Sequence, residues 1–109
     1  MSPPPDRQFW GYDFRCRETV DAMLAAFNAA GPWQWTLGDS DVYGFYLKCR
    51  PEGGAEVRVF QAAQFRTGDV ADRTEFWAEL GSDAALRPEI ERQFRKLLDN
   101  VKATDVIED

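Results

Sequence analysis

The sequence predicts an α+β fold, a two-layer sandwich in which helices cover one face of a mainly antiparallel four-stranded sheet. Some segments alternate apolar and polar residues as half-buried strands do, and others repeat apolar residues every three or four positions as amphipathic helices do. Turn residues separate these segments, which gives the element order β-α-β-β-β-α-α. With 109 residues, 44% of them hydrophobic, the chain can bury one core.

We expect a single domain over residues 8–103, between a disordered Pro-rich tail at residues 1–7 and an acidic frayed end at residues 104–109. The prolines of the tail favour an extended conformation over a helix or strand. The tail also lacks the apolar stretch of a secretory signal, and no segment of the chain has the roughly 18 apolar residues of a membrane span. These features predict a cytoplasmic protein with no membrane partner.

The first expected strand covers residues 8–17. Its inward residues are Trp10, Tyr12, Phe14 and Cys16. The apolar period then changes to that of a helix through residues 20–30, where Thr19 is the expected N-cap and the Gly31-Pro32 pair ends the helix.

Two strands over residues 33–37 and 43–49 form the expected hairpin. Their inward residues are Trp33, Trp35, Leu37, Tyr43, Phe45, Leu47 and Cys49. The turn between them contains Asp39-Ser40-Asp41, which resembles an Asp-x-Asp cation motif, but the following residues supply no further ligands. We therefore interpret it as turn chemistry. A second turn at residues 51–54 leads to the next strand, over residues 55–65, with Val57 and Val59 facing inward.

Two helices complete the expected fold. Asp72 and Glu75 have the spacing of a capping box for a short helix that ends at Gly81. The last helix, over residues 88–102, has one apolar stripe. Its members are Ile90, Phe94, Leu97, Leu98 and Val101.

The absence of histidine excludes Ser-His and Cys-His catalysis and the commonest metal ligand. Cys16 and Cys49 lack metal-site or redox spacing, so we expect two buried, reduced thiols. A net charge of −6 opposes nucleic-acid binding. We expect no metal site, no cofactor and no catalytic residues, which favours a non-enzymatic role.

One predicted surface has a composition suited to binding. On the outer face of the sheet, basic and aromatic residues are expected together: Arg15, Arg17, Tyr46, Lys48, Arg50, Arg58 and Phe60. Ion pairs on a solvated sheet would explain this face, as would a site for an anionic ligand or nucleic acid. The hypothesis we favour is a binding or adaptor domain that contacts a protein partner, or a second copy of itself, through these residues.

The alternative hypothesis is a small-ligand-binding protein or an unorthodox enzyme with an aromatic pocket between sheet and helices. The pocket would be lined by Trp10, Tyr12, Trp33, Trp35 and Tyr43. A carboxylate or a tyrosine would then perform any acid/base chemistry.

Overall fold

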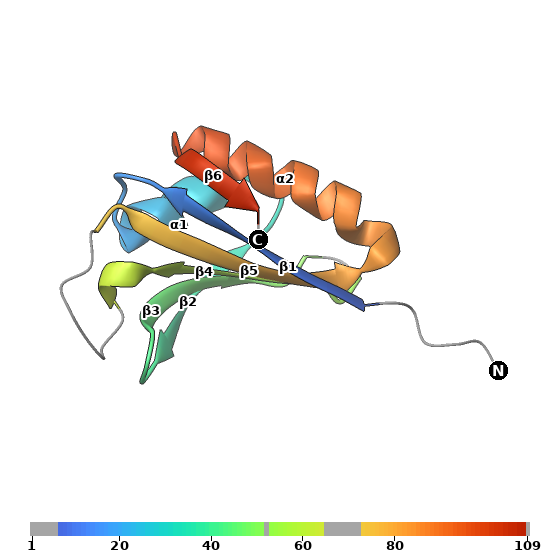
Figure 1. The fold of residues 1–109 in the computed structure, drawn as a ribbon, viewed down its shortest axis with the longest axis horizontal. Helices are drawn as coiled ribbons and strands as arrows, with labels where there is room; N and C mark the ends of the chain where they lie inside the picture. Colours follow the sequence, from blue (N-terminus) through green and yellow to red (C-terminus); the bar gives the residue numbers. More distant parts are fainter. Residues whose placement is uncertain (1–6, 52, 65–72, 109) are drawn as a thin grey trace.

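The computed structural model describes residues 7–51, 53–64 and 73–108. Its strands are β1 (Arg7–Arg15), β2 (Trp35–Ser40), β3 (Gly44–Cys49), β4 (Glu56–Gln61), β5 (Glu75–Asp83) and β6 (Thr104–Glu108). They form one antiparallel sheet in the order β2-β3-β4-β5-β1-β6. Helices α1 (Val20–Ala30) and α2 (Arg87–Asn100) lie together on one face of this sheet, and no α-helix of the described residues lies over the other face (Figure 1). The short 3₁₀ turns are η1 (Ala62–Gln64) and η2 (Ala84–Leu86).

Helix α1 begins where the sequence predicts it, because the Thr19 hydroxyl accepts a hydrogen bond of 3.1 Å from the amide of Ala22. It ends at Gly31, which has a positive φ of 54°. The helix carries the chain from β1, near one edge of the sheet, to β2 at the other edge. Because neighbours pair antiparallel throughout, β1 and β2 point the same way.

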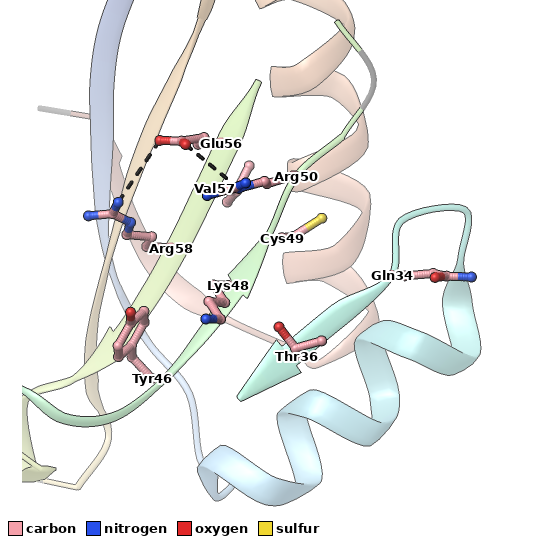
Figure 2. Close-up of a pocket in the computed structure, with 9 residues that line it drawn as sticks. All are labelled: Gln34, Thr36, Tyr46, Lys48, Cys49, Arg50, Glu56, Val57 and Arg58. Atoms are coloured by element: carbon pink, nitrogen blue, oxygen red, sulfur yellow. Dashed lines mark ion pairs between the residues drawn. The ribbon is translucent and has the colours of Figure 1, made fainter. Parts of the chain in front are cut away.

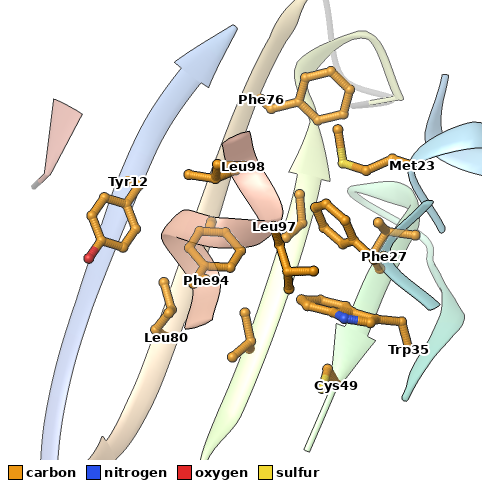
Figure 3. Close-up of a cluster of buried hydrophobic side chains, with 14 of the residues drawn as sticks. Tyr12, Met23, Phe27, Trp35, Cys49, Phe76, Leu80, Phe94, Leu97 and Leu98 are labelled. Carbon is orange, nitrogen blue, oxygen red and sulfur yellow. The ribbon is translucent and has the colours of Figure 1, made fainter. Parts of the chain in front are cut away.

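The core lies between the helices and the inner face of the sheet (Figure 3). Under α1, the ring centroids of Phe27 and Trp35 are 5.0 Å apart. Under α2, those of Tyr12 and Phe94 are 5.6 Å apart. The buried residues of α2 are Ile90, Phe94, Leu97 and Leu98, as its apolar stripe predicts.

The α+β class and the antiparallel sheet are confirmed, but the sheet has six strands and not four. The predicted short helix over residues 72–80 is wrong: Glu75–Asp83 is strand β5, between β4 and β1. Phe76, Ala78 and Leu80 alternate into the core, and pairing on both sides outweighs the helical preference of the segment. Asp72, the first residue of the predicted capping box, lies outside the described residues.

The acidic C-terminal segment is the sixth strand, so the expectation of a frayed end is also wrong. Residues Thr104–Glu108 pair with β1, and positive φ angles at Lys102 and Asp105 redirect the chain beside it. Two arginines contact its carboxylates: Arg15 lies 3.9 Å from Asp105, and Arg87 lies 3.0 Å from Glu108. Of the predicted Pro-rich tail, residues 1–6 lie outside the described residues, and Arg7 is the first residue of β1.

The predicted hairpin forms, with Trp35 opposite Cys49 and Ser40 opposite Gly44. Its turn begins later than the sequence suggests, because Gly38 and Asp39 belong to β2. The Ser40 hydroxyl accepts hydrogen bonds of 3.2 Å from the amides of Val42 and Tyr43. This confirms turn chemistry for the serine of the Asp-Ser-Asp motif.

Candidate partner-binding surface

A hollow of about 550 Å³ lies on the outer face of the sheet, over β2, β3 and β4 (Figure 2). The strand register creates it: Thr36 is opposite Lys48, and Lys48 is opposite Arg58, so their side chains share one face. Its lining residues are Gln34, Thr36, Tyr46, Lys48, Cys49, Arg50, Glu56, Val57 and Arg58. We call it the basic hollow, because three of these side chains are cationic and one is anionic.

Glu56 is the carboxylate that lies between the two arginines of the basic hollow (Figure 2). Its oxygens are 3.8 Å from Arg50 and 4.0 Å from Arg58, beyond hydrogen-bond distance. The Arg50 side chain is 86% exposed, and exposed pairs of this kind contribute about 0–1 kcal/mol. Lys48 forms no ion pair with any part of the chain that the structure describes. Within the basic hollow the positive charge is therefore only weakly compensated, and the next carboxylate on this face is that of Glu79, opposite Arg58.

Aromatic side chains continue the same face next to the basic hollow. Tyr46 stacks on Phe60 at 5.1 Å between ring centroids, and Phe60 stacks on Trp77 at 5.0 Å. Tyr43 packs on Phe60 from the hairpin turn, at 5.0 Å. Phe60 is consequently only 3% exposed although it points away from the helices. We call Tyr43, Tyr46, Phe60 and Trp77 the aromatic row.

Four of the residues predicted for the partner surface lie together, and three do not behave as expected. Those together are Tyr46, Lys48, Arg50 and Arg58, all lining the basic hollow. Phe60 is adjacent but buried under other rings, so it supports this surface without being exposed on it. Arg15 contacts Glu75 at 3.3 Å and Asp105 at 3.9 Å, which ties β5 and β6 to β1. Arg17 lies beyond the end of β1, beside the start of α1.

Strand parity already placed Glu56 on the outer face. Four other polar or aromatic residues of this surface are not in the predicted set: Gln34 and Thr36 in the basic hollow, and Tyr43 and Trp77 in the aromatic row. Trp77 was missed because residues 72–80 were interpreted as a helix, although Phe76, Ala78 and Leu80 alternate around it. Tyr43 was assigned to the inner face, but it lies in the turn and folds over the outer face. Phe45, also expected inside, is 44% exposed.

The five residues predicted for the alternative aromatic pocket lie in different places in the described part of the chain. Tyr12 is fully buried against Phe94, and Trp10 lies under the Arg87 guanidinium at 4.6 Å. The other tryptophans, Trp33 and Trp35, form a separate pair under α1, with centroids 6.2 Å apart. Tyr43 is on the opposite face.

The buried groups of the core are poorly suited to nucleophilic or acid/base chemistry. Burial raises the pKa of the Cys49 thiol to about 12 and also raises the pKa of Cys16. Burial, followed by the charge of Glu91, raises the pKa of Tyr12. Each of these side chains therefore stays protonated at neutral pH.

The described residues contain no group of three or more cysteine and carboxylate side chains placed to hold a metal ion. Neither helix in this part of the chain is long and apolar enough to cross a membrane. No protein-family model and no curated protein sequence matches this chain.

Proposed function

We propose that this chain is a non-enzymatic binding domain that contacts a protein partner through the outer face of its sheet. The observation that carries the proposal is the basic hollow beside the aromatic row, on the face without helices. Arginine and exposed aromatic rings are the side chains that most often dominate protein interfaces. The stacked rings also hold Tyr46 in place, so less side-chain entropy is lost when a partner binds.

Charge gives this surface a preference among partners. The whole chain has a net charge of −6, whereas the basic hollow has three cationic side chains and one carboxylate. A partner with an acidic surface is attracted there and repelled elsewhere on the molecule. A partner with a neutral surface is not oriented by this charge difference.

The test compares proteins that co-purify with the chain and with two single charge reversals. Lys48→Glu changes the basic hollow, and Lys96→Glu makes the same charge change on the exposed face of α2. Partners quantified by mass spectrometry should be depleted by Lys48→Glu and retained by Lys96→Glu. Equal recovery with both variants would refute a role for this surface. Sedimentation velocity of the purified chain shows in parallel whether the partner is a second copy.

A further inference from the structure

Strand β2 is an edge of the sheet beside the basic hollow, and Asn28 covers only its first residue, Trp35. It pairs with β3 on one side, and no described strand lies on its other side. Its sequence, WTLGDS, has one charged residue, Asp39, and contains neither lysine nor proline, the residues that most often block edge pairing. Thr36 of this strand lines the basic hollow. An added strand would therefore lie within reach of its cations.

A hydrogen-bond pair at Trp35 shows which backbone groups of β2 face the open edge. The Asn28 side chain accepts from the Trp35 amide at 2.7 Å and donates to the Trp35 carbonyl at 3.1 Å. The amide and carbonyl of Trp35 are therefore turned away from β3. Because these directions alternate along an antiparallel strand, the amide and carbonyl of Leu37 point to the open edge too. The Asn28 side-chain amide therefore pairs with Trp35 as a neighbouring strand would. The backbone amide and carbonyl of Leu37 are the next such pair of groups along the edge.

The opposite edge of the sheet shows what kind of segment this fold accepts. There the acidic strand β6 adds to β1, with Arg15 near Asp105 and Arg87 hydrogen-bonded to Glu108. Backbone hydrogen bonds hold the added strand against β1, and the flanking arginines bind its carboxylates. The β2 edge also has an open backbone row, and its cations, Lys48 and Arg50, lie one strand further in, on β3 and at its end.

We infer that β2 binds an extended acidic segment of a partner protein as an added strand, with the segment's carboxylates on the outer face beside Lys48 and Arg50. The inference rests on the proposed function and names the partner chemistry and the binding mode. Glu56 is the carboxylate of the basic hollow, 3.8 Å from Arg50, and it competes with the segment for that arginine. Removing its charge should strengthen binding.

A second copy of β2 suits the edge less well than an acidic segment does. The β2 residues that share the outer face with Lys48 are Thr36, Gly38 and Ser40, and none of them is charged. Pairing between two copies of β2 would bring no carboxylate to the cations from the added strand. Charge complementarity therefore favours a segment rich in Asp or Glu at alternate positions.

The test uses three synthetic peptides with blocked ends. In the first, Glu and Val alternate over eight residues, so that all carboxylates lie on one side of an added strand. The second replaces Glu by Gln and removes the charge, and the third replaces Val by Pro and removes alternate backbone donors. Fluorescence anisotropy measures affinity, and amide chemical shifts of Trp35–Ser40 report where the peptide binds.

The Glu-Val peptide should bind and shift the β2 amides, and the Gln and Pro peptides should bind roughly tenfold more weakly or not at all. Lys48→Glu should weaken binding by roughly tenfold, and Glu56→Gln should strengthen it severalfold, a gain that misfolding cannot produce. Lys96→Glu is the matched control and should have little effect.

Equal binding of the Glu and Pro peptides would refute strand addition, and equal binding of the Gln peptide would refute the acidic preference. A stable dimer that excludes the peptide would show that a second copy occupies the edge, which also contradicts the inference. In each of these cases the proposed function stands if Lys48→Glu still removes the co-purifying partner. If that variant keeps its partner, the proposed function fails independently of the peptides.

Discussion

The ring of Tyr46 lies directly over the backbone of Gly38 on the neighbouring strand. A Cβ atom added to Gly38 would overlap Cζ of that ring, closer than any real contact. Tyr46 also stacks on Phe60, so its ring lies between a glycine and a buried phenylalanine. The small residue on β2 thus sets the position of an aromatic side chain of the proposed partner surface.

We predict that Gly38→Ala displaces the Tyr46 ring from Phe60 and destabilises the fold by about 1 kcal/mol, the typical value of an aromatic pair. Urea unfolding measures the free energy, and loss of ring-current shifts at Phe60 reports the displacement. In a Tyr46→Ala background the added methyl group meets no ring, so Gly38→Ala should there cost close to nothing. Equal costs in the two backgrounds would contradict the proposed contact.

Phe60 should behave as a core residue although it lies on the face opposite the helices. Its 3% exposure results from Tyr43, Tyr46 and Trp77, so Phe60→Ala removes the centre of the aromatic row. We expect a loss of about 3 kcal/mol in the free energy of unfolding. Phe45→Ala, at a residue of the same hairpin that is 44% exposed, is the control and should cost much less. Similar losses for both variants would contradict this assignment.

Local pattern explains which parts of the fold the sequence could predict. Thr19 and the apolar spacing of α1 and α2 identify the helices, because caps and stripes depend on near neighbours. Strand β5 was missed since its identity depends on pairing with β4 and β1, which are distant in sequence. The order of strands likewise follows from long-range contacts.

The candidate surface was predictable where it follows strand parity alone. Lys48 and Arg58 share a face because each belongs to a strand with clear alternation. Parity could not show that Arg15 contacts Glu75 and Asp105, because those partners belong to β5 and β6, which were not expected. It also could not show that neighbouring rings cover Phe60.

The Cys49 thiol should make the protein less stable in alkali. Its pKa is raised from an ordinary 9.0 to about 12 in the folded chain, so above pH 9 the thiol ionises in the unfolded chain first. The stabilisation is complete below pH 9 and is lost as the pH rises toward 12, by up to about 4 kcal/mol.

Urea unfolding between pH 8 and 11 measures this loss. Cys49→Ala, which has no thiol at this position, should lose less stability over that range than the parent chain. Alkylation by iodoacetamide at pH 8 gives a second measurement, because buried Cys49 should react only after unfolding. Parallel stability curves for the two proteins would show that Cys49 does not titrate as described.

Arg87 should be the residue that keeps β6 on the sheet. Its guanidinium donates to Glu108 of β6 and to Gln8 of β1, each at 3.0 Å, and to Glu91 of its own helix at 2.6 Å. The hydrogen bond to Glu91, and then that to Glu108, raises the pKa of Arg87, because both carboxylates stabilise the charged guanidinium. Arg87→Ala removes the bridge between the start of α2, β1 and β6.

We predict that Arg87→Ala accelerates amide hydrogen exchange in Thr104–Glu108 and leaves exchange in β3 and β4 unchanged. Strand β6 depends on this bridge because it is short, pairs on one side only, and shifts register opposite Asp13 and Arg15. The matched control is Arg92→Ala, since among the described residues Arg92 pairs with Glu89 of its own helix and not with β1 or β6. Unchanged protection of β6 in Arg87→Ala would show that backbone pairing with β1 suffices. The arginines beside the added strand would then be dispensable, and the same would be expected of Lys48 and Arg50 at the β2 edge.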